Sequence, residues 1–196
     1  MRSAIFFRIS AVAGTSGVLS LSANSSSVGS RPKASLAIRR MKLRNVAGSI
    51  CSKCYALKGM YGFPVVKNAL QRRFDSLTHP QWVEALTAAI KAKEKSGFFR
   101  FHDAGDLQSV EHLSNIVQVC RNLPEIKFWL PTREFSIVAE YLKTNSLPEN
   151  LTVRLSALML ESAPPVSIAQ RLGLTTSGVS KTGFTCPASN QAGKCG

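Results

Sequence analysis

Four of the five cysteines form two pairs at opposite ends of the chain. Cys51 and Cys54 are separated by two residues in "SICSKCYALKGMYGF", and Cys186 and Cys195 lie in "FTCPASNQAGKCG". Two residues between thiols is a ligand spacing of zinc and iron–sulfur sites, and such sites often recruit distant segments. We therefore predict that Cys51, Cys54, Cys186 and Cys195 hold zinc or an iron–sulfur cluster, without choosing between the two.

Two other interpretations of these thiols stay open. A Cys-x-x-Cys pair can be a redox dithiol, but this one does not open a helix after a strand as in a thioredoxin-like unit. The thiols can also be unpaired structural residues. The fifth cysteine, Cys120, falls on the apolar helical face of "NIVQVCRNL", where we expect a small buried hydrophobic residue.

A second group of chemically active residues follows the predicted strands. His102, Asp103 and Asp106 lie in "FRFHDAGDL" after the first strand, and Arg133 follows the next in "WLPTRE". A histidine beside two carboxylates can supply a general base, a metal ligand or a hydroxyl acceptor. Arg133 can bind a phosphate or carboxylate in a bidentate fork. The alternatives are that Asp106 caps the next helix, that His102 is a partly buried structural residue, and that Arg133 pairs with Asp103.

A repeated strand-then-helix pattern positions these residues. Strands begin near 99, 126 and 151, each followed by a helical segment, and a further strand is expected near 34–40. Helices are expected over 64–77, with Val65, Ala69, Leu70 and Phe74 able to share a face, and over 78–97. The fold class is α/β: repeated βα units forming a partial (β/α) barrel or an open parallel sheet, with a cysteine-containing loop region at both ends. Parallel α/β folds gather their sites at the carboxyl ends of the strands.

Charge is unevenly distributed along the 196 residues. Residues 1–74 hold 13 Lys or Arg and no acidic residue, whereas residues 75–196 hold 12 basic and 11 acidic residues, a net charge of 12 − 11 = +1. A one-sided basic field favours a polyanion, so we expect nucleic acid or a nucleotide as partner. The candidate contacts combine charge with aromatic stacking; they are Tyr55, Lys58, Tyr61, Lys67, Arg72 and Arg73.

The length is consistent with one domain plus an arm. We expect residues 1–30 to be a flexible or atypical N-terminal extension and residues 31–196 to be a single α/β domain. No run reaches the roughly 18 apolar residues that a membrane span needs, so no membrane partner is expected.

Six short motifs in a fixed order resemble the phage gene product 88 domain family over about residues 30–196. They are "CSKCYALKGMYGFPVVKNAL", "FRFHDAGDLQS", "FWLPTRE", "LTVRLSA", "GLTTSGVS" and "TCPASNQAGKCG". The resemblance implies a bacteriophage or prophage source and a cytoplasmic site of action in the host cell. It also implies a further Cys-x-x-Cys segment beyond the final "KCG", so the chain is expected to be truncated or to lack those ligands. It implies no defined biochemistry.

Two functions are consistent with this sequence. The first is a cysteine-ligated metal or iron–sulfur enzyme that acts on nucleic acid or a nucleotide, with Asp103 as base or nucleophile and Arg133 as anion anchor. The alternative is a non-catalytic nucleic-acid-binding or phage accessory module with a structural zinc site.

Overall fold

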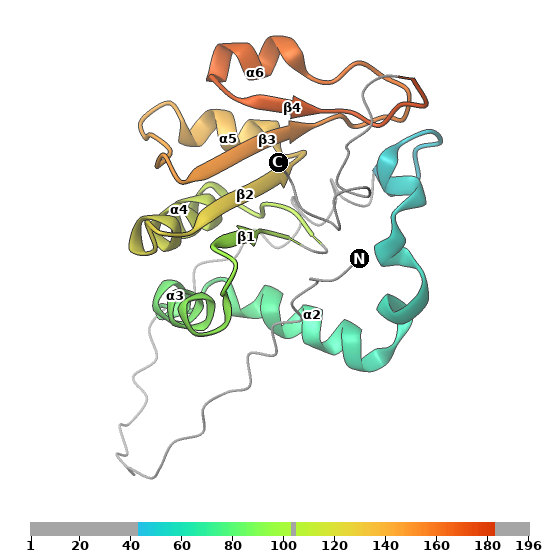
Figure 1. Cartoon of the computed structure of the whole chain (residues 1–196). Coiled ribbons are helices and arrows are strands. Elements are labelled where there is room, and N and C mark those ends of the chain that lie inside the picture. Colours follow the sequence, from blue (N-terminus) through green and yellow to red (C-terminus); the bar gives the residue numbers. More distant parts are fainter. Residues whose placement is uncertain (1–42, 103–104, 183–196) are drawn as a thin grey trace, which may run out of the picture.

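A four-stranded parallel sheet is the centre of the fold (Figure 1). The structure is a computed structural model that describes residues 43–102 and 105–182. Its strands are β1 (Phe98–Arg100), β2 (Lys127–Thr132), β3 (Leu151–Ser156) and β4 (Thr175–Ser177), in the order β1-β2-β3-β4. The register pairs Arg100 with Trp129, Trp129 with Thr152, and Arg154 with Thr175. The predicted parallel α/β fold is therefore confirmed.

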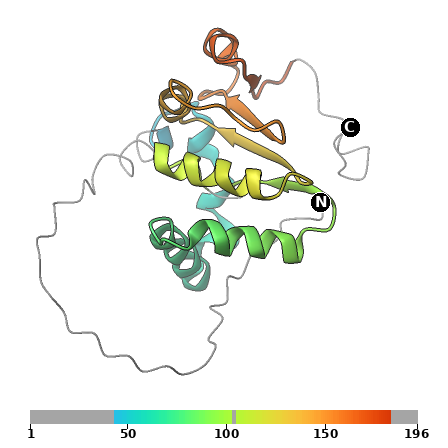
Figure 2. The same cartoon turned by 90° about the vertical axis from the view of Figure 1, so that its left-hand side faces the viewer.

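The helices that connect these strands run on one side of the sheet. They are α4 (Val110–Asn122), α5 (Phe135–Tyr141) and α6 (Val166–Leu172), and α3 (Trp82–Lys93) packs against α4. Figure 2 shows α3, α4 and α5 on the same side of the strands. Sequential strand order with helices on one side is the winding of a (β/α) barrel. No other described strand pairs with the outer edge of β1 or β4, so the described part of the sheet is open.

The core lies between the sheet and this helical layer. Phe128 and Leu130 of β2 belong to the same buried cluster as Leu113 and Ile116 of α4, and all four are 2% exposed or less. Cys120 is fully buried in the same cluster, which confirms the expectation for this residue. Its burial raises the pKa of the thiol to about 12, because a thiolate is poorly solvated in an apolar core.

Two features of the fold differ from the sequence predictions. The sequence did not indicate a strand at β4, because "TTS" lacks the apolar alternation of a half-buried strand. This strand forms through backbone pairing with β3. The strand expected near 34–40 lies outside the described residues.

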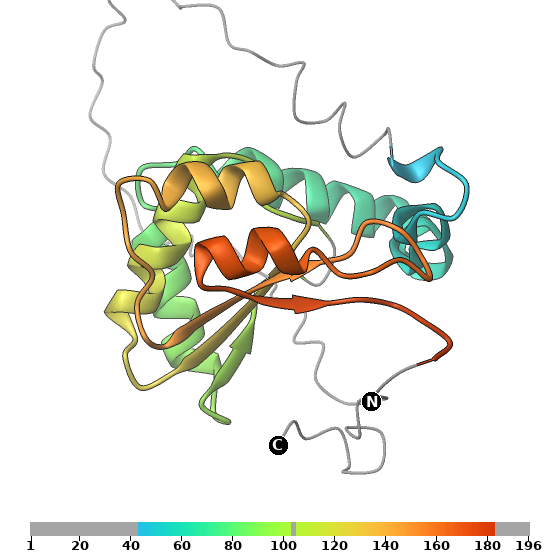
Figure 3. The same cartoon turned by 90° about the horizontal axis from the view of Figure 1, so that it is seen from above.

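An arm formed by residues 43–77 precedes α3. It contains the 3₁₀ helices η1 (Ile50–Lys53), η2 (Tyr55–Leu57) and η3 (Gly59–Gly62), followed by α2 (Pro64–Ser76). The helix at α2 was predicted and is confirmed, but its apolar residues do not enter the core: α2 buries no residue, and Val65 and Phe74 are 69% and 53% exposed. Figures 1 and 3 show the arm, in cyan and teal, running from the carboxyl ends of the strands to α3. No helix within the described ranges is long and apolar enough to cross a membrane.

Asn150 stabilises the turn that leads from α4 into the sheet. Its Nδ2 donates to the carbonyl oxygens of Cys120, Leu123 and Ile126 at 2.9, 3.0 and 3.0 Å. These are carbonyls at or just beyond the carboxyl end of α4, where intrahelical donors run out.

We expect Asn150→Ala to lower the free energy of unfolding by about 1–3 kcal/mol, because three carbonyl oxygens each lose the hydrogen bond from Asn150. Urea unfolding followed by circular dichroism measures the change. The control Asn68→Ala removes an amide from an exposed position of α2 and should change stability by about 0.5 kcal/mol or less. Equal effects of the two substitutions would contradict the role assigned to Asn150.

Candidate functional site at the carboxyl edge of the sheet

Asp106 joins the loop after β1 to the end of β2. Its Oδ1 accepts hydrogen bonds from the backbone N–H of Leu107 at 2.8 Å and from Oγ1 of Thr132 at 2.5 Å. Its Oδ2 accepts from the backbone N–H of Arg133 at 2.9 Å. Thr132 is 1% exposed, so this linkage lies at the boundary of the core. Both carboxylate oxygens of Asp106 therefore act in holding two loops together.

The N-cap of helix α4 is not Asp106, the residue that the sequence suggested for this role as an alternative. Ser109 is the N-cap, and its Oγ accepts from the backbone N–H of His112 at 3.0 Å. The alternative in which Asp106 caps this helix is therefore wrong, because its oxygens bond to Leu107 and to the β2 exit instead.

Arg133 continues this linkage from β2 to β3. Its Nε donates to the carbonyl oxygen of Ala157, the residue after β3, at 3.1 Å. Its side chain is half-buried. The structure thus brings the predicted residues Asp106 and Arg133 together, through the Arg133 backbone. The predicted ion pair between Arg133 and Asp103 lies outside the described residues, since Asp103 does.

His102 stands at the exit of β1 in an unusual backbone conformation. Its φ of 63° lies in the left-handed region, which a non-glycine residue adopts at a cost of about 1–3 kcal/mol and which is common at functional sites. Its ring lies 6.2 Å from that of Phe101 and 5.5 Å, edge to face, from that of His112. The His112 ring in turn lies edge to face with Trp82 at 5.6 Å, and its Nδ1 accepts from Gln108 N–H at 3.3 Å. Ring contacts therefore connect His102 to His112 of α4 and, through it, to Trp82 of α3.

The first cysteine segment is attached to the exit of β3. Ile50 N–H donates to Leu158 O at 3.0 Å, and Leu160 N–H donates to Gly48 O at 2.8 Å, on either side of an antiparallel bridge between Ser49 and Met159. Ser49 is fully buried there. We call residues 158–161 the β3 exit loop. Figure 3 shows the chain after β3, in orange, reaching the cyan arm.

Ser49 also starts the turn that carries the two thiols. Its Oγ accepts from Ser52 N–H at 3.0 Å and caps η1. Cys51 lies on η1, and Cys54 N–H donates to Cys51 O at 3.3 Å, so both half-buried thiols belong to one tight turn. Within the described ranges no three or more His, Cys, Asp or Glu residues form a group that could hold a metal ion. Cys186 and Cys195 lie outside those ranges.

The same β3 exit loop also holds the chain that leads towards Cys186. Glu161 N–H donates to Val179 O at 2.9 Å, and the Glu161 carboxylate accepts from Lys181 N–H at 3.1 and 3.0 Å. Ser180 Oγ donates to the same carboxylate at 3.2 Å. Glu161 has a φ of 56°, a second non-glycine residue in the left-handed region. The first cysteine segment and residues 179–181 are therefore both anchored on residues 158–161.

The predicted nucleic-acid contacts all lie on the arm. The rings of Tyr55 and Tyr61 meet edge to face at 5.7 Å, with Tyr55 56% exposed. Lys58 is the N-cap residue of η3, and α2 carries Lys67, Arg72 and Arg73. Of these cations all are exposed except Arg73, which is half-buried.

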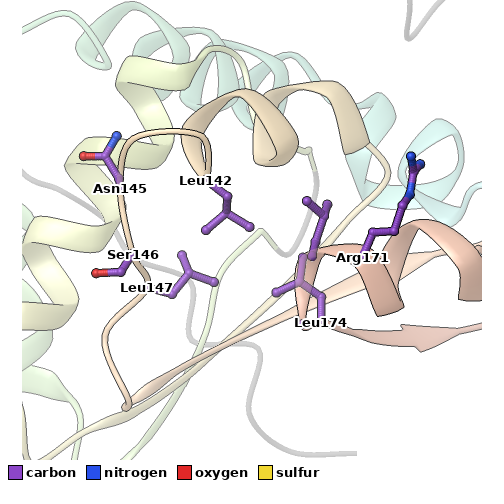
Figure 4. A pocket seen from close by; sticks show the side chains of 8 residues that line it. Leu142, Asn145, Ser146, Leu147, Arg171 and Leu174 are labelled. Carbon is purple, nitrogen blue, oxygen red and sulfur yellow. The ribbon is translucent and has the colours of Figure 1, made fainter.

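A shallow pocket lies at the opposite end of the sheet (Figure 4). It is lined by Leu142, Asn145, Ser146, Leu147, Arg171, Leu172, Gly173 and Leu174. Arg171 and Leu172 are the last two residues of α6, and the others lie between α5 and β3 or between α6 and β4, so the pocket borders the amino ends of these strands. Parallel α/β folds place their chemistry at the other edge, and this pocket is not part of the candidate site.

Residues 41–170 match the family model described as Gene product 88. The chain belongs to the gene product 88 family. No curated protein and no solved structure matches the chain. The region that matches the gene product 88 model includes Cys51, Cys54, His102, Asp106 and Arg133, and it ends before Cys186. It also contains the whole β3 exit loop.

The sequence patterns did not indicate three residues that join the loops at this edge of the gene product 88 protein: Ser49, Thr132 and Glu161. Thr132 appeared only as part of a turn, and Glu161 and Ser49 carried no visible pattern. A possible signal was Gly48, whose φ of 77° suits glycine and which stands where the cysteine segment meets the β3 exit loop. The partner of each residue is distant in sequence, so no local spacing identifies it.

Asp106→Asn should destabilise the protein by about 1–3 kcal/mol. Both oxygens of Asp106 accept hydrogen bonds. In the variant, one oxygen is replaced by an amide nitrogen, which can only donate, so at least one of these hydrogen bonds is lost. Urea unfolding measures the loss. The control Asp75→Asn changes an exposed carboxylate on α2 and should alter stability by about 0.5 kcal/mol or less. Unchanged stability of Asp106→Asn would show that the carboxylate does not hold these loops.

Proposed function

We propose that this protein is a cysteine-ligated metal or iron–sulfur enzyme that acts on nucleic acid or a nucleotide in the cytoplasm of a bacteriophage host. The observation that carries the proposal is the attachment of the Cys51–Cys54 turn to the β3 exit loop, through Ile50 to Leu158 and Leu160 to Gly48. This attachment brings thiols to the carboxyl edge of a parallel sheet, where α/β enzymes carry out their chemistry.

The thiols present fit half of a four-cysteine site. Cys51 and Cys54 come from one turn and are both half-buried, as expected for ligands that share one ion or cluster. In the proposal Cys186 and Cys195 supply the other half, and Glu161 supports this by fixing Lys181 five residues before Cys186. A bound zinc ion would supply a Lewis acid or a structural clamp, and a cluster would supply an electron carrier.

Within this proposal the polar residues have distinct roles. Asp106 is a positioning residue, because both of its oxygens accept hydrogen bonds from neighbouring loops. Arg133 uses Nε to bond Ala157 O, and the other guanidinium nitrogens are assigned to an anionic substrate group. Asp103 is assigned as base or nucleophile from its place after β1, and His102 as its neighbour in the same loop.

The arm favours a polyanionic substrate. Residues 43–77 contain six Lys or Arg and one acidic residue, a net charge of 6 − 1 = +5. Tyr55 and Tyr61 add rings on which bases stack. Nucleic acid matches this combination of charge and exposed aromatic surface.

A non-catalytic module with a structural zinc site is the second candidate. It is favoured by the use of Asp106 in holding loops together, which removes one of the residues first assigned to chemistry. In that case Asp103→Ala leaves nucleic-acid binding intact or improves it, whereas loss of a chemical activity in this variant identifies an enzyme.

Metal content tests the proposal directly. Protein purified without oxygen should contain stoichiometric zinc, or iron with visible absorption, and Cys51→Ala/Cys54→Ala should lose it. The matched control Cys120→Ala removes a thiol that is fully buried in the core and should keep the metal. Circular dichroism verifies that each variant is folded. A folded wild-type protein without metal or colour, or full metal content in the double variant, would overturn the proposal.

A further inference from the structure

The register of the sheet divides its side chains between two faces. Paired residues in adjacent parallel strands point to the same side, and successive residues alternate. Phe128, Leu130 and Val153 point into the core. The opposite face, which we call the outer sheet face, receives Phe98, Arg100, Lys127, Trp129, Pro131, Thr152, Arg154, Ser156, Thr175 and Ser177.

The outer sheet face is accessible over several of these positions. Arg100, Lys127 and Thr152 are exposed, and Trp129 and Arg154 are half-buried. Among the described elements, α3, α4 and α5 lie on the other side of the strands (Figure 2). Parallel sheets usually have both faces covered, whereas this face keeps accessible positions and presents a half-buried tryptophan between two arginines.

Its charge has one sign. The strand positions on this face include three cations, Arg100, Lys127 and Arg154, and no carboxylate. The Arg100 guanidinium lies 4.8 Å from the centroid of the Trp129 ring, a cation–π arrangement. Arg154 lies on the other side of Trp129, on β3, and its Nε donates to Thr175 Oγ1 at 3.3 Å. This contact orients the guanidinium of Arg154 on the sheet.

We propose that the outer sheet face binds single-stranded nucleic acid, with Trp129 and Arg100 as the stacking platform and Lys127 and Arg154 as phosphate contacts. Aromatic and arginine planes on a cationic surface are the means by which proteins bind unpaired strands. A duplex fits poorly, because the major groove admits a helix or a two-stranded ribbon rather than a four-stranded sheet.

Charge also argues against the chain's own ends as the occupant. Residues 1–42 contain seven Lys or Arg and no acidic residue, and residues 183–196 contain one lysine and no acidic residue. Neither segment has acidic side chains that could pair with Arg100, Lys127 and Arg154. A nucleic-acid strand from outside the chain supplies this negative charge through its phosphates.

This inference rests on the nucleic-acid part of the proposed function and adds a surface that is separate from the arm. The arm residues Lys58 and Lys67 precede β1, whereas the outer sheet face is made by the strands themselves. The two surfaces can therefore be tested independently.

Fluorescence anisotropy with a labelled 15-nucleotide oligo-dT and the full chain provides the test. Arg100→Gln/Arg154→Gln should weaken binding at least about 10-fold and reduce the slope of log affinity against log salt by about 1 to 2. The matched control Lys91→Gln/Lys93→Gln removes the same charge from α3 and should change affinity by about 2-fold or less. Oligo-dT should quench the fluorescence of wild-type protein, and Trp129→Phe should lose this quenching while Trp82 remains.

Three results would overturn the inference. Wild-type affinity in Arg100→Gln/Arg154→Gln together with weakened binding in Lys58→Gln/Lys67→Gln would assign the strand to the arm and leave the proposed function standing. Absence of any oligo-dT or oligo-U binding by wild-type protein that retains its metal would remove both the outer-face site and the nucleic-acid part of the proposed function. Binding of poly-glutamate, but not oligo-dT, through Arg100 and Arg154 would assign the face to an acidic protein.

Discussion

The backbone pairing between residues 48–50 and the β3 exit loop is the contact on which the candidate site depends. Ile50 and Leu158 are 158 − 50 = 108 positions apart, and closing so long a segment has an entropic cost that the fold must offset. The arm that follows buries little, since η1, η2, η3 and α2 contain no buried residue. The arm is therefore expected to open more readily than the core, and metal bound by its thiols would stabilise the closed form.

Two kinds of residue meet at this edge of the sheet. The side chains of Asp106, Thr132 and Glu161 make hydrogen bonds that join loops to one another. Their main role is therefore to position these loops. In the proposed function, the thiols of the Cys51–Cys54 turn bind the metal and the remaining nitrogens of Arg133 bind an anionic group. This gene product 88 protein joins the linked loops of its sheet edge to a basic arm, and in the proposed function this arrangement holds a polyanion beside a metal centre.

The sequence predicted the parts of the fold that repeat locally. The strands β1, β2 and β3 and helices α4 and α5 follow from apolar runs bounded by polar turns, and the buried Cys120 follows from helical spacing. The junction of Ser49 with Met159 and the bonds of Asp106 with Thr132 could not be predicted, because each joins segments far apart in the chain. The helical spacing of Val65 and Phe74 correctly predicted α2 but could not show their environment, since both are exposed.

X-ray absorption at the metal edge of protein purified without oxygen tests the cysteine-ligated centre most directly. A site built by the Cys51–Cys54 turn and the segment after Lys181 predicts a first shell of sulfur alone, at about 2.3 Å for zinc or an iron–sulfur cluster. The signal should disappear in Cys51→Ala/Cys54→Ala. A first shell of nitrogen and oxygen only, or a sulfur shell that persists in this variant, would contradict the site.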